Sequence, residues 1–240
     1  MTYYRIAQLA EDVRVALDEN VNGAALPSGT SPLSDIDTLS LDAIIRSKIE
    51  DAARLVELNA PLSMLDADEG KEFEDLNVSH NVGIGIGATI PLPDDFLRLI
   101  RFRMSDWSRP VTEAITVHDK RYAMQQSPCY GVHGNPDRPV VAATGIYDEG
   151  EREIVRVLEL YTTGTGSYAS EALYIPEPVI CEEDEGDPDT LSVQLCDNFV
   201  RPVVYYCAYL VASTLGDKER ADILAAEYKE MTGADEAGGG

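Results

Sequence analysis

The chain has 240 residues, with 43 Asp and Glu against 19 Lys and Arg, and its formal net charge is -24. Such an excess of negative charge repels polyanions, which argues against a protein that grips DNA phosphates directly. Hydrophobic residues make up 44% of the sequence, as in a globular protein with a core of its own. The acidity fits either a generally solvated surface or a dedicated acidic face.

The cysteine spacing and the hydropathy argue against a secreted disulfide-bonded protein and against a membrane-spanning protein. No two cysteines have C-x-x-C spacing, and the first residues lack the apolar segment of a secretory signal. No apolar stretch reaches the roughly 18 residues that a membrane-spanning helix needs. We therefore expect reduced cysteines, synthesis in the cytoplasm, no membrane insertion and no cofactor. The cysteines are Cys129, Cys181, Cys196 and Cys207.

A first amphipathic helix is predicted over residues 4–18. Its apolar side chains recur three and four positions apart, as in Ile6, Leu9 and Val13. Glycine and proline residues then predict a surface loop over residues 21–37.

A second helix is predicted to begin after Ser40, a good N-cap residue, and to end at Asn59. It ends there because the residue before Pro61 is pushed out of the helical conformation. Its charged residues are expected to form a water-facing surface opposite the apolar face. They are Arg46, Lys48, Glu50, Asp51, Arg54 and Glu57.

The middle of the chain predicts an antiparallel β-rich region. After Pro61 the apolar spacing changes to a period near 2, and glycine-rich turns separate the apolar runs. Ile100, Phe102 and Met104, for example, alternate with arginines, as in a half-buried strand. The other predicted strands cover residues 83–90, 111–117, 138–147, 153–162 and 171–180.

Residues 182–189 are too charged and too rich in turn formers to be buried, so they predict an exposed acidic loop. The candidate residues of this acidic loop are Glu182, Glu183, Asp184 and Glu185.

Helical spacing returns at Asp197, a candidate N-cap. Gly216 is expected to end this helix and Asp217 to cap a last one. The tail, residues 233–240, should fray or dock on a partner.

Together these patterns indicate an α+β protein. We expect residues 1–60 and 191–232 to pack as one helical bundle domain. Residues 61–190 are expected to form a β-rich domain, as a small sheet or barrel, and residues 233–240 a flexible tail.

No catalytic, cofactor-binding or metal-binding residue is predicted. The glycines at 83, 85 and 87 lack G-x-G-x-x-G spacing, and they fit a tightly packed strand better than a nucleotide loop. The histidines His80, His118 and His133 show no helical metal-ligand pairing. Cys129 would gain a catalytic base only if the fold brought a histidine to it.

A short positive stretch stands out in this negative chain. Its arginines either pair with acidic residues of the same chain or meet the acidic loop of a neighbouring copy. The candidate inter-subunit contacts are Arg98, Arg101, Arg103, Trp107 and Arg109.

The order of elements and five short stretches resemble the head-to-tail connector or tail-adaptor ring proteins of tailed phages, especially those of Bacteroidetes-type phages and prophages. The resemblance covers most of residues 1–232 as an architecture. The stretches are residues 92–98 (LPDDFLR), 105–111 (SDWSRPV), 124–126 (MQQ), 138–140 (RPV) and 205–208 (YYCA).

The resemblance implies a structural virion protein at the head-tail junction, made in the host bacterial cytoplasm. It implies a homo-oligomeric ring, commonly twelvefold, between portal and tail proteins, with DNA passing through its centre without specific binding. Two other interpretations of the sequence stay open. One is a soluble cytoplasmic module that binds a ligand or a protein without catalysis, and the other is a hydrolase built from dispersed histidines and carboxylates.

Overall fold

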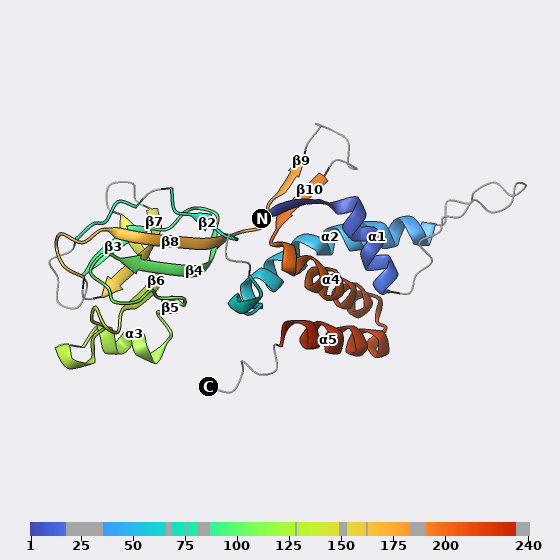
Figure 1. Cartoon of the computed structure of the whole chain (residues 1–240). Coiled ribbons are helices and arrows are strands. Elements are labelled where there is room, and N and C mark those ends of the chain that lie inside the picture. The colour runs from blue at the N-terminus through green and yellow to red at the C-terminus, as the bar shows by residue number, and fades with distance from the viewer. Residues whose placement is uncertain are drawn as a thin grey trace, which may run out of the picture. The chain divides into compact units, whose positions relative to one another are not determined.

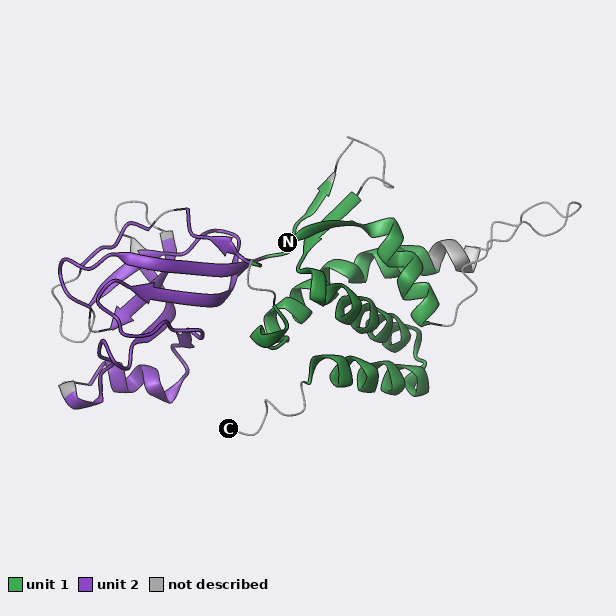
Figure 2. Cartoon of the chain, in the orientation of Figure 1, with its two compact units in different colours: residues 1–69, 177–240 green, residues 70–176 purple. Residues whose placement is uncertain are grey.

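The structure, a computed structural model, divides the chain into two compact units (Figures 1 and 2). Unit 1 consists of Met1–Glu69 and Glu177–Gly240, and unit 2 consists of Gly70–Pro176. The chain therefore leaves unit 1 once and returns to it once. The structure describes residues 1–17, 36–65, 69–74, 76–80, 87–127, 129–148, 153–161, 163–182 and 191–233.

The helices of unit 1 are held together by the apolar face of α4, which packs against α1, α2 and α5. Val203, Cys207 and Val211 are buried on that face, and their four-residue spacing places them one above another. Burial of each aliphatic side chain contributes roughly 1.5–3 kcal/mol. The described helices of this unit are α1 (Ile6–Ala16), α2 (Ile36–Asn59), α4 (Val200–Leu215) and α5 (Lys218–Thr232).

Unit 1 also contains a three-stranded antiparallel sheet in the order β1-β10-β9. Its strands are β1 (Thr2–Arg5), β9 (Ile180–Glu182) and β10 (Leu191–Leu195). The first helix therefore begins at Ile6 and not at residue 4, because the preceding residues pair with β10. Residues 191–195, which were predicted to lie within the helical bundle domain, also form a strand.

The junction between α4 and α5 follows the predicted capping chemistry. Gly216 has a left-handed φ of +81° and ends α4. Its N–H donates to the carbonyl of Ser213 at 3.3 Å, and the N–H of Asp217 donates to that of Ala212 at 3.0 Å. The carboxylate of Asp217 then accepts a hydrogen bond from the N–H of Arg220 at 3.1 Å and caps α5. Both predictions are confirmed.

The other predicted helix boundaries are confirmed in part. Helix α2 ends at Asn59 as expected, with the short 3-10 turn η1 (Leu62–Met64) after Pro61, but it begins at Ile36. Asp197 does not cap α4, because Phe199 occupies the N-cap position; the carboxylate of Asp197 instead accepts a hydrogen bond from the Tyr4 hydroxyl at 3.1 Å. A 3-10 turn, η4 (Asp197–Phe199), precedes α4 instead.

Unit 2 is built on two sheets, in the orders β2-β8-β4 and β3-β7-β6-β5. A long antiparallel hairpin, β6 with β7, runs from the pair Val140–Tyr161 to the pair Asp148–Glu153. The strands are β2 (Lys71–Glu72), β3 (Ala88–Pro91), β4 (Phe96–Met104), β5 (Ile115–Thr116), β6 (Val140–Asp148), β7 (Glu153–Tyr161) and β8 (Ala169–Pro176).

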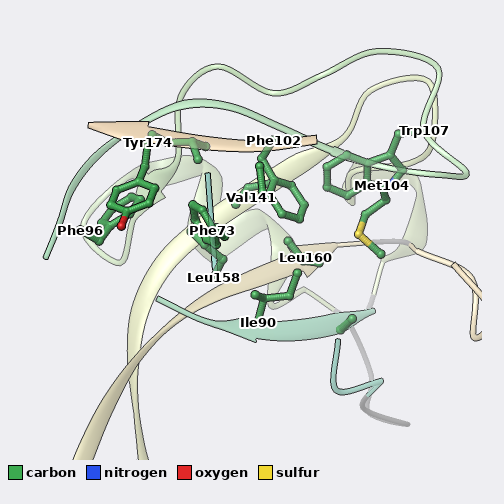
Figure 3. Close-up of a cluster of buried hydrophobic side chains, with 13 residues drawn as sticks. Phe73, Ile90, Phe96, Phe102, Met104, Trp107, Val141, Leu158, Leu160 and Tyr174 are labelled. Atoms are coloured by element: carbon green, nitrogen blue, oxygen red, sulfur yellow. The ribbon is translucent and has the colours of Figure 1, made fainter. Parts of the chain in front are cut away.

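The two sheets of unit 2 share one hydrophobic core (Figure 3). Phe102 and Tyr174 come from the first sheet, and Ile90 and Leu158 come from the second; all four side chains are fully buried. Phe73 packs edge-on against Tyr174 with ring centroids 5.1 Å apart. Edge-on aromatic pairs add about 0.5–1.5 kcal/mol to the stability from buried area.

Two elements of unit 2 differ from the prediction. The strand expected over residues 111–117 is reduced to an isolated bridge at Val111 and to β5, which pairs with β6 in parallel. A short helix, α3 (Lys120–Gln125), follows β5, and the carboxylate of Asp119 caps it by accepting the N–H of Arg121 at 2.7 Å. A 3-10 turn, η2 (Tyr130–Val132), comes next.

The mixture of helices and antiparallel sheets confirms the predicted α+β class. Several predicted segments lie wholly or partly outside the described residues. These segments are most of the loop at 21–37, the glycine-rich stretch from 83 to 86, the acidic loop from 183 onward and the tail after Gly233.

Candidate functional site

The arginines of β4 are the first candidate surface. Arg101 Nε lies 3.0 Å from a carboxylate oxygen of Glu171 on β8, and Arg103 Nη1 lies 3.6 Å from the other. Arg103 also donates from Nε to the carbonyl of Trp107 at 3.2 Å. Pairing within the chain therefore occupies these two arginines. Because all three charged side chains are at least a third exposed, each pair contributes no more than about 1 kcal/mol.

The remaining three residues of this set have different surroundings. Trp107 is 2% exposed and packs edge-on against Phe102, so its indole belongs to the core of unit 2. Burial lowers the pKa of Arg98, and the charge of Glu113 opposes this. Arg109 is exposed, lines a hollow of about 260 Å³ with Glu113, and makes no ion pair with the described residues. Arg109 is therefore the member of the set most open to a partner.

The negative charge is distributed unequally between the two units. Unit 2 contains ten Lys and Arg against fifteen Asp and Glu, so it carries five of the 24 excess negative charges. Unit 1 carries the other 19. Of the predicted acidic loop, Glu182 ends β9, and Glu183, Asp184 and Glu185 lie outside the described residues.

A polar triad fastens β2 to the start of β4 in unit 2. Asp95 accepts a hydrogen bond from Lys71 Nζ at 3.0 Å and another from the Tyr174 hydroxyl at 2.7 Å. Burial raises the pKa of Tyr174 to about 12, and the bond to Asp95 adds to this. Burial also tends to raise the pKa of Asp95, but the bonds from Tyr174 and Lys71 hold it below its usual value. All three groups keep their ordinary protonation at neutral pH and act as a clamp.

The free cysteines of the chain differ in exposure. Cys196 and Cys207 are buried free thiols, and burial raises the pKa of both, to about 12 for Cys207. Cys129 is exposed. The ring Nε2 of His133 lies within hydrogen-bonding distance of the backbone carbonyl of Ser127. Within the described part of the chain, no group of three or more His, Cys, Asp or Glu is arranged to hold a metal ion.

Glu57 of α2 was expected to face water, but its side chain is fully buried in unit 1. Among the described residues, neither carboxylate oxygen has a partner at full hydrogen-bonding geometry. Burial raises the pKa of Glu57 to about 8; the backbone of Cys196 opposes the shift and the charge of Glu69 adds to it. The signal was present in the sequence, because Glu57 lies four residues after buried Ala53 and so falls on the apolar face.

Glu69 is the second carboxylate of this buried region and the last residue of unit 1 before the chain crosses to unit 2. It is 8% exposed, and its carboxylate accepts the N–H of Asp197 at 2.6 Å. The bond ties the departing chain to the segment that begins the C-terminal helices.

Each of the two units has its own buried core and a charged surface, and the described residues hold no metal-binding cluster. Comparison with known protein families gives one match, to the SU10 adaptor protein model, over residues 4–238. The chain belongs to the SU10 adaptor protein family. This adaptor is therefore a structural protein of tailed phages, of the kind that joins other virion proteins. No curated protein and no solved structure matches it significantly.

Family membership confirms the broader part of the resemblance drawn from the sequence, a phage structural adaptor. Among the described residues of the adaptor, no helix is long and apolar enough to cross a bilayer.

Proposed function

We propose that this adaptor is a head-to-tail connector, in which identical copies form a closed ring between the portal and the tail. The observation that carries the proposal is the family match over residues 4–238, which takes in both compact units. In a ring of identical copies, the same pair of surfaces meets at every interface. Assembly of the ring therefore depends on noncovalent contacts and needs no catalytic group.

The acidic composition supports a role for the ring as a DNA conduit. We place the acidic unit 1 and the loop of Glu182, Glu183, Asp184 and Glu185 toward the channel. Carboxylates there repel the phosphate backbone, so DNA slides through without being held. Specific DNA binding is not part of the proposal.

Arg109 is the proposed contact between neighbouring copies, because it is exposed and makes no ion pair with the described residues. A neighbour that carries a large acidic excess offers it partners. A charge pair at the rim of an interface mainly sets orientation and association rate.

Assembly on the portal tests the ring. The full-length adaptor is mixed with the portal protein of its phage, and the complex is weighed by native mass spectrometry. We expect one dominant complex containing many adaptor copies, each of 26.2 kDa. The portal is included because the proposal allows the isolated adaptor to be a monomer until it meets the portal. Binding of only one or two copies per portal would contradict a closed ring.

The same measurement tests Arg109. We expect Arg109→Glu to lower the number of bound copies at limiting adaptor concentration, with a roughly tenfold weaker assembly. Lys120→Glu is the matched control, because Lys120 is also an exposed cation of unit 2. Equal effects of the two substitutions would show that only net charge matters.

A further inference from the structure

Three helices of unit 1 border an open groove of about 780 Å³ that is lined by both apolar and charged side chains. Each helix presents one face to it. Helix α4 lies at its base with Val200 and Val204, α1 contributes Val15, and α5 contributes Ile223. Figure 1 shows α5 lying alongside α4.

Two of these side chains are unusually exposed for aliphatic residues. Val15 is 60% exposed and Ile223 is 56% exposed, although both border the same groove. Single exposed aliphatic residues are common on protein surfaces. Two that flank the same concave surface indicate a site where a partner's apolar side chains can be buried. Helices that bind such grooves use anchor residues spaced i, i+3, i+4 and i+7.

The rim of the groove is mainly acidic. Asp12, Glu219 and Glu227 border it and make no ion pair with the described residues. The carboxylates of Asp197 and Asp217 border it as well, but they accept hydrogen bonds from Tyr4 and from the backbone of Arg220.

The basic residues of the groove do not balance this charge. The guanidinium of Arg201 lies over the ring of Tyr205, 5.7 Å from its centroid, and Arg220 is the other cation at the groove. Five acidic side chains therefore border the groove against two basic ones. Its occupant needs apolar anchors and positive charge around them.

A second copy of unit 1 is a poor occupant, because unit 1 carries 19 of the 24 excess negative charges. Bringing two such surfaces together adds repulsion at every contact. We propose that the groove binds a basic amphipathic helix of another virion protein. This inference rests on the proposed function in one respect, that the adaptor joins proteins other than itself.

The binding test uses a synthetic, fluorescently labelled helical peptide of roughly 18 residues, or five turns, with Leu at i, i+3, i+4 and i+7 positions and Lys elsewhere. A second peptide keeps the Leu pattern and carries Glu in place of Lys. Fluorescence anisotropy with the full-length adaptor is expected to show saturable binding of the basic peptide, weakened by salt, and none of the acidic one. Failure of the basic peptide to bind would overturn the proposal.

Variants show whether the peptide occupies the groove. We expect Ile223→Ser to weaken peptide binding about tenfold. Val179→Ser is its matched control, because Val179 is 55% exposed in the same unit and does not border the groove. Circular dichroism melting of both variants confirms that they fold, as expected for substitutions at exposed side chains.

The charge on the rim is tested in the same way. Glu219→Lys should weaken binding of the basic peptide about tenfold. Glu50→Lys changes another exposed carboxylate of unit 1, outside the groove, and should have a much smaller effect. Equal losses in the two variants would mean nonspecific attraction to an acidic protein and would overturn the proposal.

Two further outcomes separate the possible failures. If Ile223→Ser changes the self-association of the adaptor in light scattering, the groove contacts a second copy and the proposal is wrong. If the wild-type adaptor assembles on the portal while the basic peptide does not bind, only the groove assignment fails. If the wild-type adaptor does not assemble on the portal, the ring proposal fails whatever the peptide does.

Discussion

Single residues show where this fold departs from the ordinary rules of burial. Glu57 is fully buried and has no well-formed hydrogen bond to another described residue, and burial raises the pKa of its carboxyl to about 8. An ionised carboxylate in that place would lack both water and a counter-charge, so the folded protein holds the neutral acid. Glu57 is therefore a cost to stability in the neutral range.

The pH dependence has a definite sign. The pKa of Glu57 rises from 4.5 to about 8 on folding. Below pH 4.5 both the folded and the unfolded chain carry the proton, whereas between pH 4.5 and 8 only the folded chain does. Unfolding then releases a proton, so the free energy of unfolding falls as the pH rises through this window.

Glu57→Gln should remove this dependence, because the amide does not titrate. We expect the variant to exceed the wild type in stability by roughly 2–3 kcal/mol near pH 7, with a much smaller difference near pH 4.5. Urea unfolding followed by circular dichroism at several pH values measures this difference. Glu50→Gln, an exposed position on the same helix, is the control. Parallel pH profiles for wild type and Glu57→Gln would contradict the assignment.

At the scale of elements, some helix ends could be predicted from neighbouring residues in the sequence, but the pairing of distant strands could not. Gly216 and Asp217 were predicted correctly because each stops or caps its helix through its own backbone or side chain, whereas the caps predicted at Ser40 and Asp197 were wrong. Strands β1 and β10 were missed because the partners, Thr2 and Leu195, lie at opposite ends of the chain. Helix α3 had a local signal in Asp119, but it lies between strand-forming runs.

The candidate surfaces show the same limit. The sequence singled out the arginines near Trp107, but it could not show that Glu171 pairs with two of them or that the indole is buried. The groove of unit 1 is formed by helices from both ends of the chain, so no single stretch predicts it.

Asp217→Ala tests the capping of α5. Loss of an N-cap costs about 1 kcal/mol, and we expect the melting temperature of the helical signal to fall by about 2–4 °C. Circular dichroism follows unit 1, which contains most of the described helix. Fluorescence of the single tryptophan, Trp107, follows unit 2 and should shift less. Asp222→Ala, an exposed position within α5, is the control. An unchanged helical melting temperature, or an equal shift in the control, would contradict the cap.

At the scale of the whole molecule, the chain has two compact units with unequal net charge. This organisation suits a structural protein that acts by binding other virion proteins. Unit 1 holds most of the negative charge and the groove with its acidic rim, and unit 2 holds an aromatic core and the exposed Arg109. Membership in the SU10 adaptor protein family connects these features to the virion of a tailed phage. In our proposal, shape and repeated interfaces perform the function.

A cryo-electron microscopy reconstruction of the neck of the virion tests this claim most directly. We expect a ring of copies of the two units between the portal and the tail, with carboxylates of unit 1 facing the DNA channel. A neck that lacks this chain, or that contains it as isolated copies outside the channel, would contradict the proposed function.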